Sequence, residues 1–289
     1  MALSTFDSLP TISEQKFMRT LVHISDIHFG RVDYAIVERL REKIGALAPD
    51  LIVVSGDLTQ RARSAQFIEA RDFLESLPQP QIVVPGNHDI PMHNVFARFV
   101  TPLEKYKKYI TADLQPFFAD EEIAVIGINT ARSLTVKDGR INDDQIAGIR
   151  AKMCGLDSQM LKIVVTHHPF DLPAGFDEDD IVNNAARAMP QIADCGADVF
   201  LSGHLHVSHI SHTAERYKLD SGRSALVIQA GTATSTRGRG EANSFNVIEF
   251  ESPRLVIKRL ECQAAETGFI EAQTQEFLQT EKGWSKIEI

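Results

Sequence analysis

Five short polar motifs each end an apolar run, and together they carry side chains that bind divalent metals. In chain order they are Asp26-Ile27-His28, Gly56-Asp57, Gly86-Asn87-His88-Asp89, Thr166-His167-His168-Pro169 and Gly203-His204-Leu205-His206. Carboxylate and amide oxygens and imidazole nitrogens are the ligands that metals use in phosphate chemistry. The set therefore indicates a two-metal hydrolase of phosphate esters.

The elements that must position these motifs are short buried strands alternating with amphipathic helices. Helices are expected over residues 34–47, 64–77, 143–153 and 185–195. Strands are expected over 21–25, 51–54, 82–84, 123–128, 161–165, 199–201, 206–210, 225–229, 245–249 and 255–259. In an α/β sheet the loops beyond the carboxyl ends of the strands converge. All five motifs are therefore predicted to meet at one edge.

The remaining segments suggest how the chain is divided. Residues 1–18 are expected to be an N-terminal extension, 19–262 the main domain, and 263–289 a C-terminal extension. A non-periodic insert near 170–184 contains the acidic run Asp177-Glu178-Asp179-Asp180 and is predicted to cap the site.

Composition excludes several classes of protein. The chain has 289 residues, 43% of them hydrophobic and 24% charged, with a formal charge of −9. That charge disfavours a nucleic-acid partner and a polybasic hold on an anionic membrane. No stretch approaches the roughly 20 apolar residues of a membrane span, and residues 1–18 lack the apolar core of a secretory signal. The sequence predicts a cytoplasmic protein and leaves room for a homo-oligomer.

Three cysteines, Cys154, Cys195 and Cys262, are widely spaced and odd in number. They form no CxxC pair, and no disulfide framework follows from their spacing. We expect three thiols in a reducing compartment.

With these motifs in place, the chain resembles the calcineurin-like metallophosphoesterase superfamily over residues 20 to about 235. The resemblance implies an α/β fold, a four-layer α/β/β/α sandwich of two mixed sheets flanked by helices. It also implies two divalent metal ions, Mn, Fe or Zn. One metal would be bound by Asp26, His28 and His206 and the other by Asn87, His167 and His204, with Asp57 bridging both.

The resemblance also assigns roles in catalysis. The metals would lower the pKa of a bound water, and the resulting hydroxide would attack phosphorus in line. His88 would protonate the leaving oxygen or stabilise the transition state, and Asp89 would hydrogen-bond the far nitrogen of His88. Weaker candidates for substrate contact are His168, His93 and Arg132.

Each motif has a plainer explanation when it is taken alone. Asp26 would cap a turn, His167 would be a buried structural histidine, and Gly86-Asn87-His88-Asp89 would be an ordinary turn. Their joint occurrence in one order favours the metal site.

The substrate is less sharply indicated. The motif forms resemble the bacterial class III cyclic-nucleotide phosphodiesterase-like branch, which implies a small diester such as a cyclic nucleotide or a glycerophosphodiester. The alternatives are a phosphomonoesterase, a nucleotide-sugar or lipid pyrophosphohydrolase, and a non-enzymatic interaction scaffold with this fold.

Overall fold

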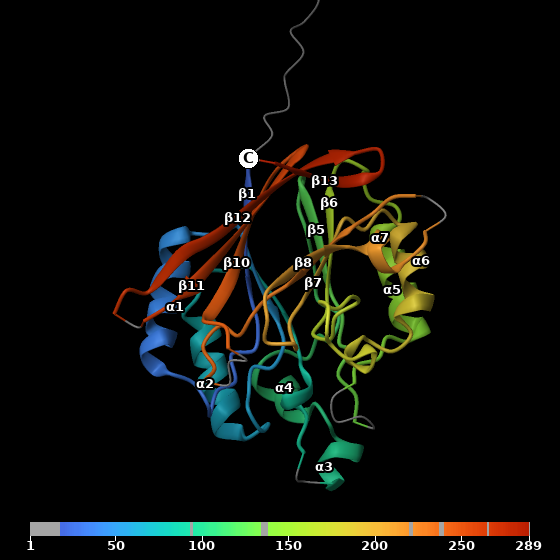
Figure 1. Ribbon diagram of the computed structural model, residues 1–289. Helices are drawn as coiled ribbons and strands as arrows, with labels where there is room; N and C mark the ends of the chain where they lie inside the picture. The colour runs from blue at the N-terminus through green and yellow to red at the C-terminus, as the bar shows by residue number, and fades with distance from the viewer. Residues whose placement is uncertain are drawn as a thin grey trace, which may run out of the picture.

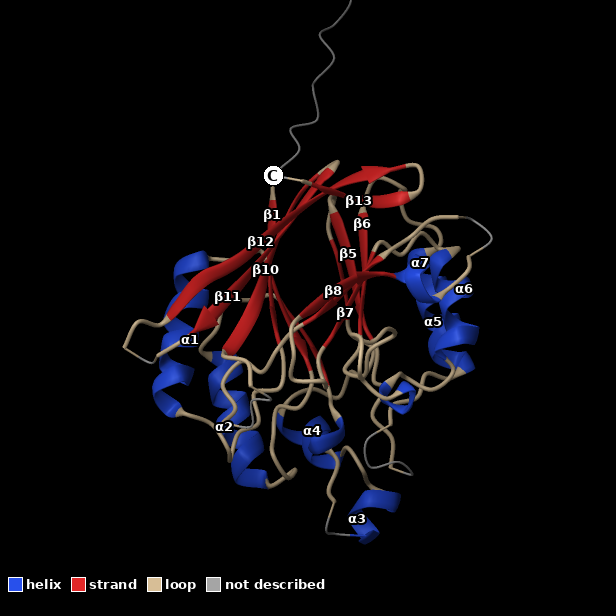
Figure 2. Cartoon of the chain, viewed as in Figure 1, coloured by secondary structure: helices blue, strands red, loops and turns tan. Residues whose placement is uncertain are grey.

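Two mixed β-sheets packed face to face form the centre of the molecule (Figures 1 and 2). The computed structural model describes residues 18–92, 95–133, 138–219, 222–236, 240–264 and 266–288. The seven-stranded sheet has the order β13-β12-β11-β10-β1-β2-β3, and the six-stranded sheet has the order β4-β5-β6-β7-β9-β8. Their bounds are β1 (Arg19–Ile24), β2 (Leu51–Ser55), β3 (Gln81–Val84), β4 (Phe117–Ala119), β5 (Ile123–Gly127), β6 (Leu161–Val165), β7 (Val199–Ser202), β8 (His209–His212), β9 (Leu226–Gln229), β10 (Asn243–Glu251), β11 (Arg254–Cys262), β12 (Phe269–Thr280) and β13 (Gly283–Ile287).

Helices cover the outer face of each sheet, which completes the expected four layers. In Figure 1, α1 and α2 lie outside the seven-stranded sheet, and α5 and α6 lie outside the six-stranded sheet. The helices are α1 (Tyr34–Leu47), α2 (Ser64–Glu75), α3 (Val95–Val100), α4 (Glu104–Tyr109), α5 (Asp143–Met153), α6 (Ala185–Ala193) and α7 (Thr213–Arg216). None of these described helices has the length and hydropathy that crossing a bilayer requires.

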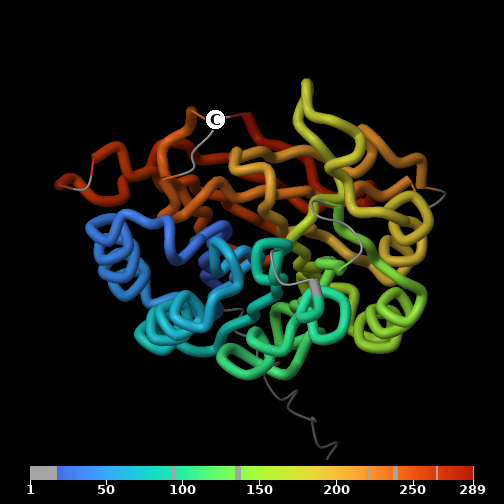
Figure 3. The backbone as a smooth tube through the Cα atoms, turned by 90° about the horizontal axis from the view of Figure 1, so that it is seen from below, coloured from blue at the N-terminus to red at the C-terminus, as the bar shows by residue number. Residues whose placement is uncertain are grey.

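The strands that carry the site are buried on both faces, which explains their continuous apolar runs. β1, β2 and β3 pair in parallel, as do β5, β6, β7 and β9. Between the sheets, residues such as Val53, Ile163 and Leu201 form one apolar core. A second core lies under α1 and α2, and a third lies under α5 and α6. Figure 3 shows these two pairs of helices on opposite sides of the molecule. The parallel strands are therefore held in place by water-free apolar packing on both of their faces.

The structure differs from the predicted elements in the second half of the chain. β8 begins at His209 rather than at residue 206, because His206 lies in a turn with a positive φ of 61°. Residues 263–289, expected as an extension, add β12 and β13 to the seven-stranded sheet, and Trp284 packs against Phe250 in the inter-sheet core. This C-terminal part is integral to the domain.

The cysteine prediction is wrong for two of the three residues. Cys154 and Cys195 form a disulfide with a Cα–Cα distance of 4.1 Å, and Cys262 is a buried thiol. Cys154 is the first residue after α5 and Cys195 is the second after α6, and these helices pack side by side on the same face of the six-stranded sheet. Their proximity comes from this helix packing and not from their spacing of 41 residues.

Candidate metal centre

The loops after five parallel strands bring the predicted ligands together. Asp26 follows β1, Asp57 follows β2, Asn87 follows β3, His167 follows β6 and His204 follows β7. Backbone hydrogen bonds join neighbouring loops within each sheet, from Asp26 N to Gly56 O and from Gly203 N to His167 O. Between the sheets, His204 N donates to Asp26 Oδ2 at 2.9 Å. Residues up to 178 positions apart in the sequence thus meet at one edge.

A first cluster consists of Asp26, His28, Asp57 and His206, whose potential ligand atoms all lie within 4.8 Å of one another. All four side chains are buried. Asp26 Oδ1 is 3.2 Å from His206 Nε2 and 3.6 Å from His28 Nε2. The two imidazole nitrogens themselves are only 3.2 Å apart. Three donors therefore point at one small volume.

Asp57 connects this cluster to a second one. Its Oδ2 atom is 3.6 Å from His28 Nε2, and its Oδ1 atom is 3.4 Å from His167 Nε2. The side chain is only 1% exposed. The two oxygens of one carboxylate thus face the two sites, as a bridging ligand requires.

The second cluster is rich in imidazole. His167, His168 and His204 bring their ligand atoms within 4.8 Å of one another, and Asn87 Oδ1 lies 3.0 Å from His167 Nε2. The Ser55 carbonyl is 2.8 Å from His167 Nδ1, a bond in which the ring nitrogen donates. This fixes the tautomer and leaves the Nε2 lone pair free for a metal.

His168, a candidate for substrate contact, is itself a member of this cluster. It is completely buried, with its ring centroid 4.6 Å from that of His204. Its Nδ1 atom is 2.8 Å from the hydroxyl of Thr130, in the loop after β5. No sequence pattern identified this partner, which lies two residues before the candidate Arg132.

The pKa of each ionisable group in the centre depends on the other groups that face it. Burial opposes ionisation of Asp26 and Asp57, but the facing histidines outweigh it and hold the pKa of both carboxyls below the usual range. Burial also acts on His167, yet Asp57 raises the pKa of that imidazole to about 9. By contrast, burial and repulsion from His167 lower the pKa of His204 to about 3. The two buried carboxylates are thus held ionised by the histidines that face them.

The backbone at the ligands is strained in a way that ordinary residues avoid. Asp26, His28, Asp57, His204 and His206 have φ values of 52, 58, 52, 74 and 61°. A left-handed conformation at a non-glycine residue costs about 1–3 kcal/mol and usually marks a functional site.

Close packing of the loops leaves no room for side chains at two positions. A Cβ atom at Gly86 would overlap Asp57, and one at Gly203 would overlap Ser25 and lie 2.5 Å from Asp26 Oδ2. Glycine at both positions lets backbone and ligand carboxylates approach closely.

His88 stands beside the centre, but its orienting partner is not the predicted one. Its ring centroid is 4.9 Å from that of His28, and its Nδ1 atom lies 2.9 Å from the Gln60 carbonyl. Among the described residues, the Asp89 carboxylate accepts bonds from the N–H groups of Gly86, Leu58 and Thr59 and from the Thr59 hydroxyl. Asp89 therefore braces the loop after β2, because the 3-10 turn Asn87–Asp89 directs its carboxylate there. No sequence pattern around Gln60 predicts that its backbone carbonyl orients the ring of His88.

The remaining predicted residues and the predicted insert differ in whether they contact the metal centre. The insert near 170–184 does reach the centre, since Asp180 Oδ1 lies 4.0 Å from His204 Nε2. Arg132 donates to the carbonyls of Asn129 and Ala131 and to Gln145 Oε1, so its guanidinium anchors the loop to α5. His93 lies outside the described residues.

The residues present fit a pair of divalent cations. Asp26 Oδ1 is buried and has no hydrogen-bond partner within the described part of the chain, although it faces two imidazoles. A buried carboxylate oxygen without a partner is costly, and a cation among the three donors would satisfy it. The mixed nitrogen and oxygen donors suit Mn, Fe and Zn alike.

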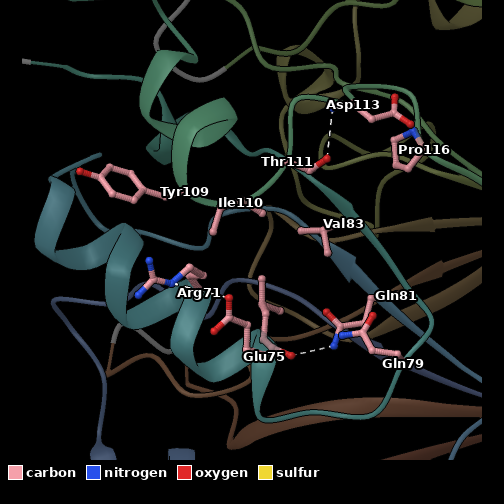
Figure 4. Close-up of a pocket in the computed structure, with 11 residues that line it drawn as sticks. Arg71, Glu75, Gln79, Gln81, Val83, Tyr109, Ile110, Thr111, Asp113 and Pro116 are labelled. Atoms are coloured by element: carbon pink, nitrogen blue, oxygen red, sulfur yellow. Dashed lines mark hydrogen bonds and ion pairs between the residues drawn. The ribbon is translucent and has the colours of Figure 1, made fainter.

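A separate cavity lies away from the metal centre. A cavity of about 320 Å³ lies between α2 and the segment after α4. Figure 4 shows Arg71 and Glu75 on one of its sides and Thr111 and Asp113 on the other. It contains none of the predicted ligands.

Comparison with known families agrees with this geometry. The family model described as calcineurin-like phosphoesterase matches residues 19–208. The chain belongs to this family. The matched region contains all seven predicted metal ligands and His88.

The curated relatives of this chain are distant from it in sequence. It is 26% identical over 210 residues to a probable cyclic nucleotide phosphodiesterase of Xenorhabdus bovienii, covering 72% of this chain and 80% of that protein. It is 24% identical over 168 residues to the glycerophosphodiester phosphodiesterase GpdQ of Enterobacter lignolyticus, covering 53% of this chain. The match spans only 58% of the length of GpdQ.

Solved structures share the fold at low identity. PhoD superposes with a TM-score of 0.66 at 10% identity, covering 94% of this chain and 72% of that one. A purple acid phosphatase from yellow lupin (Lupinus luteus) gives a TM-score of 0.64 at 12% identity, covering 91% and 54%. These likenesses establish the metallophosphoesterase architecture.

Proposed function

We propose that the protein is a two-metal phosphodiesterase acting on a small diester, such as a cyclic nucleotide or a glycerophosphodiester. The observation that carries this proposal is the placement of Asp57, which directs one carboxylate oxygen toward each of two donor clusters. The distant relatives, which include a probable cyclic nucleotide phosphodiesterase and a glycerophosphodiester phosphodiesterase, support the diester class.

The donor sets would hold the two ions by different groups. Asp26, His28 and His206 would bind one, and Asn87, His167 and His204 would bind the other, with Asp57 shared. When bound, such a pair supplies the charge that activates the attacking water and neutralises the phosphoryl oxygens.

His88 is placed to handle the proton of the leaving group. His88 Nδ1 lies 2.9 Å from the Gln60 carbonyl, and we assign the opposite ring nitrogen, Nε2, to the substrate. The backbone N–H of His88 also donates to Asp57 Oδ1 at 2.8 Å, which ties this residue to the bridging carboxylate. We therefore assign His88 as the general acid that protonates the departing oxygen.

The test compares a diester with a monoester. The manganese-reconstituted protein should hydrolyse bis(p-nitrophenyl) phosphate in clear preference to p-nitrophenyl phosphate. A preference for the monoester would move the assignment to a phosphatase.

A His88→Ala variant sharpens the test, because the loss of an acid matters most for poor leaving groups. It should retain its metals and lose about 10²–10⁴-fold in rate on alkyl diesters, with a smaller loss on nitrophenyl diesters. Equal losses on both kinds of leaving group would refute the role of His88.

The cytoplasmic location stays a prediction.

A further inference from the structure

The segment after the Gly86-Asn87-His88-Asp89 motif exposes large apolar side chains. Met92, Phe96, Phe99 and Val100 are 39, 72, 53 and 59% exposed, and we call these four residues the apolar patch. In Figure 1, α3 projects from the body below α4, at the end of the molecule where the ligand-bearing loops lie. Contiguous exposed apolar groups of this kind mark a surface that contacts an apolar partner or phase.

The patch is anchored to the catalytic end of the fold. Arg98, between the two phenylalanines, is 8% exposed and donates from Nε to the Ser133 carbonyl at 2.7 Å. Val100 lines a cavity of about 290 Å³ together with Ile90, Leu103 and Ala131. This anchoring holds the patch beside the loops of the centre.

Two residues that line this cavity are close in sequence to residues of the centre. Ile90 lies two residues after His88, and Ala131 follows Thr130, whose hydroxyl contacts His168. The cavity beside the patch is therefore lined by the same loops that carry His88 and Thr130.

The charge around the patch is opposite to that of the whole chain. Residues 92–110 contain four basic side chains, Arg98, Lys105, Lys107 and Lys108, and one acid, Glu104, in a chain of net charge −9. Lys107 and Lys108 are exposed, and Lys107 lines the same cavity as Val100. Arg98 and Lys105 donate to the carbonyls of Ser133 and Ala62, so Lys107 and Lys108 are the cations that this segment exposes. Exposed apolar side chains with exposed lysines nearby are a combination that anionic lipid surfaces bind.

A second copy of the chain fits this surface less well. In a two-fold symmetric contact each patch would meet its own copy, and the lysines of the two α4 helices would approach each other. A lipid surface instead satisfies the phenylalanines and the lysines together.

We propose that the apolar patch docks on the surface of an anionic membrane and that the enzyme hydrolyses phosphodiesters carried by lipids there. The proposal rests on the proposed function and names its substrate class. Water forms a bond to phosphorus, the ester P–O bond breaks, and the departing alkoxide takes a proton. The products are a phosphate monoester and an alcohol, without oxidation or reduction.

The experiment uses the manganese-loaded full chain and vesicles of phosphatidylcholine with phosphatidylglycerol, itself a phosphodiester. Sedimentation measures binding, release of product from the vesicles measures hydrolysis, and bis(p-nitrophenyl) phosphate measures activity in solution. The test variant is Phe96→Ser/Phe99→Ser. The matched control is Ile270→Ser, because Ile270 is 48% exposed on β12 in the C-terminal part of the seven-stranded sheet.

The double variant should bind vesicles at least about tenfold more weakly, because each phenylalanine contributes about that factor when it leaves water. Its hydrolysis of phosphatidylglycerol should fall in parallel, while its activity in solution stays at the wild-type level. Ile270→Ser should change neither. Removing phosphatidylglycerol or raising the salt concentration should weaken wild-type binding.

Three outcomes would overturn the proposal. They are equal vesicle binding by wild type and double variant, equal hydrolysis of vesicle-borne lipid by both, and conversion of a wild-type dimer to a monomer by the two substitutions. The last would show that the patch contacts a second copy. Failure of the underlying function is recognised separately, because the wild type would then not hydrolyse bis(p-nitrophenyl) phosphate.

Discussion

Replacing Asp57 with asparagine tests whether a single carboxylate serves both metal sites. The substitution keeps the shape of the side chain but removes its charge and one of its two oxygens. Those oxygens lie 3.4 Å from His167 Nε2 and 3.6 Å from His28 Nε2, and the group is 1% exposed, so water cannot replace it. The loss should therefore appear at both sites at once.

The magnitude follows from the burial of the charge. Removing one partner of a buried charge pair costs about 3–5 kcal/mol, which corresponds to roughly 10²–10³-fold or more in the dissociation constant of each metal. After gel filtration, the wild type should retain close to two metals per chain by elemental analysis. Asp57→Asn should retain almost none and lose nearly all diesterase activity.

A buried aspartate elsewhere provides the control. Asp198 is 3% exposed, lies at the start of the turn into β7, and accepts a hydrogen bond from Lys162 N. Asp198→Asn should leave the metal content unchanged. Loss of only one metal from Asp57→Asn, with the other retained at full affinity, would refute the bridging role.

Three further predictions follow. Gly203→Ala should lower the free energy of unfolding by about 1–3 kcal/mol and weaken metal binding at the site that contains Asp26, because the added Cβ would overlap the loop that carries this ligand. Thermal melts measure the stability and elemental analysis measures the metal content. A variant as stable and as well loaded with metal as the wild type would contradict this prediction. Burial raises the pKa of Asp198 from 3.8 to about 6, so its neutral form stabilises the fold below pH 4, and that contribution, about 3 kcal/mol, is lost as the pH rises through 6. Relative to wild type, Asp198→Asn should therefore gain stability between pH 4 and pH 7 in urea titrations, and a constant difference would show that the carboxyl ionises normally. Chelation of the metals should lower the melting temperature, since ligands that bind only the folded state stabilise it, and the shift should vanish in Asp57→Asn.

The sequence was sufficient to predict the edge at which the site forms. Apolar runs such as Leu161–Val165 predicted buried parallel strands, and the geometry of parallel sheets then placed the residues after them together. The four-layer architecture followed from the same alternation of strands and helices. Helices 34–47 and 143–153 match their observed bounds.

Other features depend on tertiary geometry that no local pattern encodes. The orientation of His88 depends on a main-chain carbonyl at Gln60, and any residue type supplies a carbonyl. The positive φ angles at Asp26 and His204 are imposed by the loops that hold them and not by their own preferences. The disulfide between Cys154 and Cys195 depends on how two helices end side by side.

The most direct test of the central claim is a crystal structure of the manganese-loaded protein with an anomalous difference map. We predict two peaks roughly 3.5–4 Å apart with the Asp57 carboxylate between them, one beside Asp26, His28 and His206 and the other beside Asn87, His167 and His204. A single peak, or a second peak bound by His168 with Asp57 in contact with only one ion, would contradict it.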